Sequence, residues 1–173
     1  MKKLLVVVDY QNDFVDGALG FKGAEKIEKE IINLINEFEK EQQDIVFTLD
    51  THDENYLTTV EGKNLPIPHC LKNTKGHELT DGLKPYVKEY LIFEKEGFGS
   101  LALGEFIKDK NYDEIVFCGL VSDICVFSNA IIAKAAAGTH AEIKVIKKAT
   151  SSNDLSVQED AFKLLKHLHI QVL

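Results

Sequence analysis

The sequence predicts an α/β fold in three layers: a doubly wound, six-stranded, mostly parallel sheet with helices on both faces. Short apolar runs rich in β-branched residues alternate with segments of helical periodicity along the whole chain. Such alternation is typical of parallel strands joined by helices. The 173 residues have the length of one domain, and a hydrophobic content of 45% is enough for a sizeable core. We therefore expect one domain spanning residues 1–173.

The first half of the chain contains three predicted strands and two predicted helices. The helix at residues 23–43 repeats its apolar side chains at helical spacing and so has one apolar face. A weaker helix at 77–87 follows a loop with two prolines. The strands are residues 4–9 (LLVVVD), 44–50 (DIVFTLD) and 90–95 (YLIFEK).

The second half continues the same pattern. Gly138 supplies a stop signal for the helix that begins near residue 123. The predicted strands are residues 113–120, 141–149 and 170–173, and the predicted helices are residues 100–111, 123–137 and 156–168.

Composition argues against a nucleic-acid or membrane partner. The chain has 28 acidic and 20 basic residues, a net charge of −8, and no basic cluster with interleaved aromatic residues. Asp9 interrupts the apolar start after five residues, which is too short for an export signal. The three cysteines, Cys70, Cys118 and Cys125, form no C-x-x-C pair. We expect a cytoplasmic protein with reduced thiols.

Reactive side chains lie at or just after the ends of four of the predicted strands. These are Asp9, Asp50 with His52, Lys95 and Cys125. Each alone has a simpler interpretation as a polar or packing residue at a strand exit. Together they lie at the edge of the sheet where doubly wound proteins bind their ligands. The sequence therefore predicts a functional site at this edge.

Cys125 is the candidate nucleophile. It falls where the strand at 113–120 turns into a helix, so free backbone N–H groups and the helix dipole are expected to favour its thiolate. A nearby Lys95 would lower the pKa of the thiol further, and Asp9 could take and return its proton. The backbone amides of Val121 and Cys125 could hold an oxyanion. The alternative is a packing cysteine, which is how we interpret Cys118.

Asp50, His52 and His69 form a second group. Asp50 and His52 belong to the segment DTH, and His69 to PIPHC. Imidazole and carboxylate ligands suit zinc, iron or manganese. From the spacing alone, a metal site and a pair of solvated histidines are both open.

Five segments carry a family resemblance: VVVDYQNDFVDGAL, LDTHDEN, PIPHC, FEKEGFGS and GLVSDICV. Through nearly its whole length the chain resembles the nicotinamidase branch of the isochorismatase-like cysteine hydrolases. The resemblance implies a catalytic triad of Asp9, Lys95 and Cys125 that hydrolyses an amide through a thioester. It also implies an oxyanion hole from the amides of Val121 and Cys125, with a cis peptide bond before Val121.

The resemblance further implies one divalent metal ion, for which zinc is our first choice and iron or manganese the alternatives. Asp50, His52 and His69 fall on the matching ligand positions. Relatives vary in the fourth ligand, and no histidine lies between His52 and His69. Glu61 is our choice, and Asp53 and Glu54 are its competitors.

Substrate contacts are expected from Phe14, Phe98 and Gln11. The two aromatic rings correspond to positions that sandwich the substrate ring in relatives. Gln11 is also expected to orient the loop that bears Asp9. The chain has no tryptophan, so Leu65 or Pro66 must occupy a place where many relatives carry one.

The expected function is hydrolysis of nicotinamide to nicotinate and ammonia in NAD salvage, with pyrazinamide as a side substrate. The alternative is a related cysteine amidohydrolase that acts on another small amide, such as a carbamoyl or ureido compound. A hypothesis from another class is a redox sensor that uses Cys125. The sequence leaves open whether the chain forms a homo-oligomer.

Overall fold

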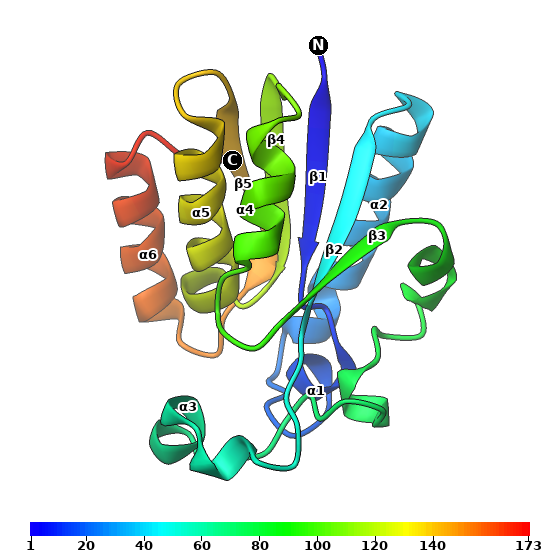
Figure 1. Cartoon of the computed structure of the whole chain (residues 1–173), viewed down its shortest axis with the longest axis vertical. Helices are drawn as coiled ribbons and strands as arrows, with labels where there is room; N and C mark the ends of the chain where they lie inside the picture. The colour runs from blue at the N-terminus through cyan, green and yellow to red at the C-terminus, as the bar shows by residue number, and fades with distance from the viewer.

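The structure, a computed structural model, describes residues 1–173 apart from the side chain of Val87. Its six strands form one sheet in the order β3-β2-β1-β4-β5-β6 (Figure 1). The predicted six-stranded α/β sheet is confirmed, and all its neighbouring strands are parallel. The strands are β1 (Lys3–Val8), β2 (Asp44–Asp50), β3 (Leu91–Lys95), β4 (Glu114–Leu120), β5 (Glu142–Ser151) and β6 (Gln171–Val172).

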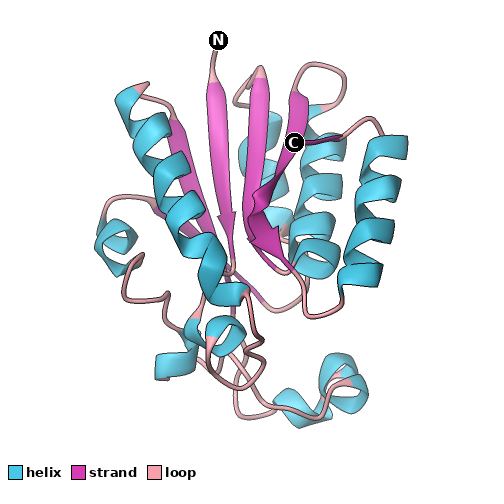
Figure 2. Cartoon of the chain, turned by 180° about the vertical axis from the view of Figure 1, so that it is seen from behind, coloured by secondary structure: helices cyan, strands magenta, loops and turns pink.

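Helices cover both faces of the sheet, as Figures 1 and 2 show from opposite sides. Helix α2 packs on one face, and α4, α5 and α6 pack on the other. The short helices α1 and α3 lie beyond the carboxyl ends of the strands. The helices are α1 (Asn12–Val15), α2 (Glu28–Lys40), α3 (Val60–Asn64), α4 (Leu101–Lys108), α5 (Phe127–Ala137) and α6 (Leu155–His167).

The core follows the alternation of side chains along each strand. Leu4, Val6 and Val8 of β1 pack with residues of α4, α5 and α6. Leu5 and Val7 point the other way, into a cluster with α2. All five side chains are buried. Burial on both faces explains why the sequence of β1 is a continuous apolar run.

The prediction of a helix at residues 77–87 is wrong. The chain instead forms two 3₁₀ turns, η3 (Lys75–His77) and η4 (Lys84–Lys88). Between them the backbone pairs with the loop after β1, where Asn12 N–H donates to Glu78 O and Thr80 N–H donates to Tyr10 O. These pairings use backbone groups that a helix would need.

The other four predicted helices form, two of them with changed beginnings. The one predicted from residue 23 begins as a 3₁₀ turn, η1 (Ala24–Ile27), before α2. The one predicted from residue 123 begins as a π-helical turn, η5 (Ser122–Val126), before α5. Helix α5 ends at Gly138, whose positive φ of 61° fits its predicted role as a stop. One further 3₁₀ turn, η2 (Tyr56–Thr58), precedes α3.

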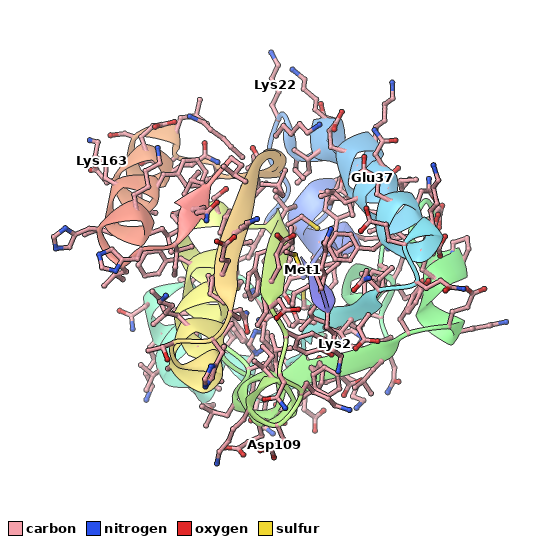
Figure 3. The ribbon with its side chains drawn as sticks, turned by 90° about the horizontal axis from the view of Figure 1, so that it is seen from above. Met1, Lys2, Lys22, Glu37, Asp109 and Lys163 are labelled. Carbon is pink, nitrogen blue, oxygen red and sulfur yellow. The ribbon has the colours of Figure 1, made fainter. Side chains whose placement is uncertain are left out.

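Different segments of the chain lie at the two ends of the sheet. Met1 and Lys2 lie at the amino ends of the strands, near the centre of the view in Figure 3, where Lys22, Glu37 and Lys163 project from the periphery. The loops, α1 and α3 gather at the carboxyl ends. Among the described residues, no helix has both the length and the apolar character needed to cross a membrane.

Candidate active site

The four predicted reactive groups lie together at the carboxyl ends of β1 to β4. Asp9 directly follows β1, Asp50 and Lys95 are the last residues of β2 and β3, and Cys125 lies in η5 after β4. Asp50 and Lys95 are register partners between adjacent strands. Parallel pairing therefore brings these residues to one place although they are far apart in sequence.

Asp9 is fully buried between β2 and Lys95. Its Oδ1 accepts a hydrogen bond from Thr48 Oγ1 at 2.6 Å, and its Oδ2 forms an ion pair with Lys95 Nζ at 2.7 Å. Its φ of 45° is uncommon for a residue other than glycine. Burial raises the pKa of Asp9, and the positive charge of Lys95 opposes this shift.

Cys125 lies beside the same lysine. Its Sγ is 3.6 Å from Lys95 Nζ, and only 5% of the residue is exposed. Burial and the Asp9 carboxylate raise the pKa of the Cys125 thiol well above its ordinary value, and Lys95 opposes them. This direction is opposite to the lowered pKa that we expected, because burial outweighs the charge of Lys95. The thiol needs a base, and Asp9 is the adjacent one.

A tight turn connects β4 to Cys125. Gly119 has φ 106°, and a Cβ there would lie 2.0 Å from Val8 O, so this position requires glycine. The peptide bond between Leu120 and Val121 is cis, as the family resemblance implied. The Val121 carbonyl accepts hydrogen bonds from backbone N–H groups within η5. The turn thus carries both backbone amides that we expect in the oxyanion hole, those of Val121 and Cys125.

Asn129 is a site residue that the sequence analysis missed. Its side chain is fully buried, and Nδ2 donates to Cys125 O at 2.8 Å and to Phe98 O at 3.1 Å. Its Oδ1 accepts from Ser100 N–H at 2.9 Å. One amide therefore ties the nucleophile turn to the loop after β3. An asparagine inside a helical pattern gives no sequence signal for this role.

Asp50, His52, Glu61 and His69 form a group that could hold a metal ion. One ligand atom from each lies within 4.8 Å of the others. Asp50 Oδ2 is 3.0 Å from His52 Nε2 and 3.3 Å from His69 Nε2. Glu61 Oε1 is 3.5 Å from His69 Nε2 and 3.8 Å from His52 Nε2. The structure thus brings our chosen fourth residue, Glu61, to the other three.

The donor set fits a divalent cation. His69 Nδ1 donates to Ile67 O at 2.8 Å, which turns Nε2 toward the group, as is usual for a metal-binding histidine. Burial opposes protonation of His69, but hydrogen bonds to Asp50 and Glu61 raise its pKa to about 10. Hydrogen bonds to His52 and His69 outweigh burial and hold the pKa of Asp50 below its usual range. Two carboxylates facing two imidazoles suit zinc, iron or manganese.

The competing acids do not join this group. Asp53 and Glu54 are exposed, and Asp53 Oδ1 accepts a hydrogen bond from Asn55 N–H. Helix α3 carries Glu61 back toward the histidines, and Thr59 caps its first turn by accepting from Gly62 N–H. A short helix in the loop therefore decides which acid reaches the site.

Tyr56 is the aromatic residue beside the two histidines, and the sequence analysis missed it. Its buried ring packs edge-on at 4.7 Å from the His52 ring and 5.0 Å from the His69 ring, measured between centroids. Its hydroxyl donates to Leu65 O at 2.8 Å. Leu65 thus contacts Tyr56 through its carbonyl, and Pro66 is exposed.

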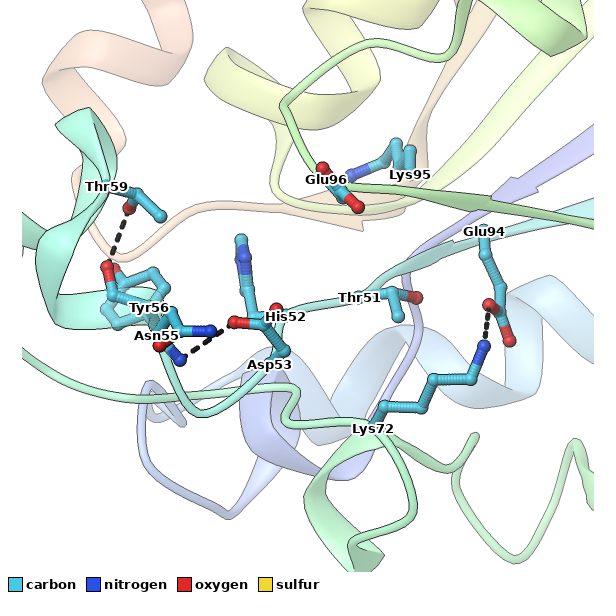
Figure 4. Close-up of a pocket in the computed structure, with 10 residues that line it drawn as sticks. All are labelled: Thr51, His52, Asp53, Asn55, Tyr56, Thr59, Lys72, Glu94, Lys95 and Glu96. Atoms are coloured by element: carbon cyan, nitrogen blue, oxygen red, sulfur yellow. Dashed lines mark hydrogen bonds and ion pairs between the residues drawn. The ribbon is translucent and has the colours of Figure 1, made fainter.

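A pocket of about 900 Å³ opens onto the site (Figure 4). Phe98 is 47% exposed, whereas Phe14 is buried with its ring 5.6 Å from that of His69. The exposed ion pair of Lys72 and Glu94 belongs to the pocket wall. The lining residues are Thr51, His52, Asp53, Asn55, Tyr56, Thr59, Lys72, Glu94, Lys95 and Glu96.

Gln11 has the contacts of a positioning residue. It is fully buried, its Oε1 accepts from Asp50 N–H at 2.8 Å, and its Nε2 donates to the carbonyls of Asp50 and His77. These bonds use both amide protons and fix the backbone of Asp50. The structure therefore favours its expected role in orienting the site over direct contact with a substrate.

Comparisons with known proteins identify the family of this chain. A family model of the isochorismatase domain matches residues 3–173, and the chain belongs to this family of hydrolases. It is similar to nicotinamidase PncA from Bacillus subtilis, with 30% identity and a TM-score of 0.86 over 99% of both chains.

Two further solved structures are similar. Pyrazinamidase of Pyrococcus horikoshii, in complex with zinc, is 26% identical with a TM-score of 0.86, covering 100% of this chain and 99% of that one. N-carbamoylsarcosine amidase from Thermoplasma acidophilum is 25% identical with a TM-score of 0.81, covering 99% and 95%.

Proposed function

We propose that this protein, as one domain of residues 1–173, hydrolyses nicotinamide to nicotinate and ammonia in NAD salvage, with pyrazinamide as a side substrate. One observation carries the proposal. Lys95 Nζ lies 2.7 Å from Asp9, 3.6 Å from Cys125 and 3.1 Å from Asp50, so a nucleophile with its base adjoins a group of metal ligands. Similarity to a nicotinamidase and to a pyrazinamidase supports the choice of substrate.

The first half of the reaction forms a thioester. Asp9 accepts the thiol proton as Cys125 Sγ bonds to the amide carbon, and the carbonyl π electrons move to oxygen. The backbone N–H groups of Val121 and Cys125 donate to this oxyanion. As the carbonyl re-forms, the C–N bond breaks and Asp9 gives its proton to the leaving nitrogen. Ammonia departs.

The second half hydrolyses the thioester. Asp9 takes a proton from water as the water oxygen bonds to the carbonyl carbon, and the same two amides hold the new oxyanion. Collapse breaks the C–S bond, and the sulfur regains a proton as the carboxylic acid leaves. The sum is amide plus water to acid plus ammonia.

Lys95 has an electrostatic role in both halves. Burial opposes its charge, but the carboxylates of Asp9 and Asp50 raise its pKa, so it stays protonated. A fixed ammonium 3.6 Å from Sγ stabilises the thiolate that develops during attack. The same charge opposes the rise in the pKa of Asp9 that burial causes.

Asp50, His52, Glu61 and His69 would hold the metal ion, for which we propose zinc. When bound, the cation supplies a Lewis acid that can hold the ring nitrogen of the substrate. The rings of Phe14 and Tyr56 pack against histidines of this group, and we propose that they and Phe98 contact the planar ring.

The similarity to N-carbamoylsarcosine amidase favours a second candidate, hydrolysis of a carbamoyl or ureido compound. It would use the same Asp9, Lys95 and Cys125 but gives no reason for the group of metal ligands. Side-by-side measurement of kcat/KM for nicotinamide and N-carbamoylsarcosine, on protein loaded with zinc, separates the two. We expect kcat/KM to be at least about a hundredfold higher for nicotinamide. A loss of this order arises when a group in the site, here the bound metal, has no partner on the substrate. The opposite preference would replace our proposal with the second candidate.

A further inference from the structure

A chain of buried polar side chains reaches the turn before Cys125 from outside the catalytic group. Gln158 Nε2, on α6, donates to Ser122 Oγ at 2.7 Å. Ser122 Oγ lies 2.9 Å from Thr150 Oγ1, on β5. Thr150 Oγ1 in turn lies 2.8 Å from Gly119 O. All four residues are buried.

Counting protons fixes the direction of every bond in this chain. A carbonyl oxygen only accepts, so Thr150 gives its single hydroxyl proton to Gly119 O. Thr150 must then accept from Ser122, and Ser122 must accept from Gln158. The chain therefore runs from Gln158 through Ser122 and Thr150 to Gly119, and each hydroxyl both donates and accepts.

Two members of the chain lie on either side of one expected oxyanion donor. Gly119 and Ser122 flank the Leu120–Val121 peptide, whose Val121 amide is one of the two donors. The pairing of β4 with β5 is irregular at this segment. Phe117 pairs with Val145, but Gly119, two residues further along β4, pairs with Thr150, five residues further along β5. The side-chain bonds thus support the turn where the register of the ladder shifts.

We propose that Ser122, Thr150 and Gln158 are positioning residues that fix the Val121 amide for the oxyanion. The inference rests on the proposed function, because it assigns that amide a role in amide hydrolysis. An oxyanion exists only in the tetrahedral states, so a displaced donor lowers kcat and leaves the binding of neutral substrate unchanged.

The test compares Thr150→Val with Thr150→Ser. Valine keeps the shape of threonine but has no hydroxyl, so it leaves Gly119 O and Ser122 without their partner. Serine keeps the hydroxyl and should restore the chain. Thr80→Val is the matched control, since Thr80 is also a buried threonine but its hydroxyl donates to Glu28 Oε2, outside the chain that reaches Gly119.

Two readouts are measured on the zinc-loaded proteins. For Thr150→Val we expect kcat for nicotinamide to fall about 10-fold to 100-fold with KM within about twofold, less than the loss of about 10²-fold to 10³-fold on removing a donor outright. We also expect faster backbone hydrogen exchange in the peptide that covers residues 119–125. Thr150→Ser and Thr80→Val should match the wild type in both.

Specific results overturn the proposal. Unchanged exchange at residues 119–125 in Thr150→Val would do so, as would faster exchange with an unchanged kcat. If Thr150→Val fails to fold, Gln158→Leu removes the first donor of the chain and is judged by the same two readouts. If the wild type releases no ammonia from nicotinamide, the proposed function fails, and the exchange measurement alone decides whether the chain fixes the turn.

Discussion

Lys95 Nζ lies 3.1 Å from Asp50 Oδ1, and this contact joins the nucleophile group to the group of metal ligands. The same ammonium is 2.7 Å from Asp9 Oδ2, so one buried cation separates two buried carboxylates. The charge of Lys95 therefore acts on the pKa of both acids.

Replacing this lysine tests the shared role. Lys95→Met leaves Asp9 and Asp50 buried without their cation, so we expect a loss of about 3–5 kcal/mol in the free energy of unfolding and loss of turnover. Urea denaturation of metal-free protein and an ammonia assay measure the two effects. The control is Lys163→Met, whose ion pair with Asp160 is exposed and should change stability little. Wild-type stability and turnover in Lys95→Met would contradict the assignment.

The raised pKa of Cys125 predicts how its reactivity depends on pH. Only the thiolate is alkylated, so below the thiol pKa the rate constant with iodoacetamide should rise by about tenfold per pH unit. We expect the rate to be still rising at pH 9, because burial favours the thiol in the resting protein. Mass spectrometry of the peptide that contains Cys125 distinguishes it from Cys70 and Cys118. A rate already constant from pH 7 upward would instead indicate a resting thiolate.

Glu61→Gln tests the fourth metal ligand. The change keeps the size of the side chain and removes its charge, so zinc affinity measured by calorimetry should fall by at least about tenfold. Glu54→Gln is the control, because Glu54 is an exposed acid in the same loop and lies outside the ligand group. Unchanged zinc binding in Glu61→Gln would remove Glu61 from the set.

The sequence predicted where the candidate catalytic and metal-ligating groups lie in the fold. Asp9, Asp50, Lys95 and Cys125 each lie at or just after the end of a strand that its apolar run makes recognisable, and parallel pairing brings such strand ends together. Glu61 could be chosen only through the family resemblance, since its place at the site depends on α3.

Other features could not be predicted, because they depend on contacts between distant residues. Asn129 and Thr150 are ordinary polar residues in sequence, and their roles arise from hydrogen bonds to segments far along the chain. The raised pKa of the Cys125 thiol depends on its burial, which the strand-to-helix pattern does not predict. The helix predicted at 77–87 failed because its backbone pairs with the loop after β1 instead.

Ammonia release from nicotinamide by the zinc-loaded protein, measured beside Cys125→Ala, tests the central claim most directly. We predict steady release by the wild type and none detectable in the variant, with equal zinc content and equal folding in both. Release by Cys125→Ala at a rate near that of the wild type would contradict the role of Cys125 as nucleophile. No release by the wild type would contradict the proposed substrate.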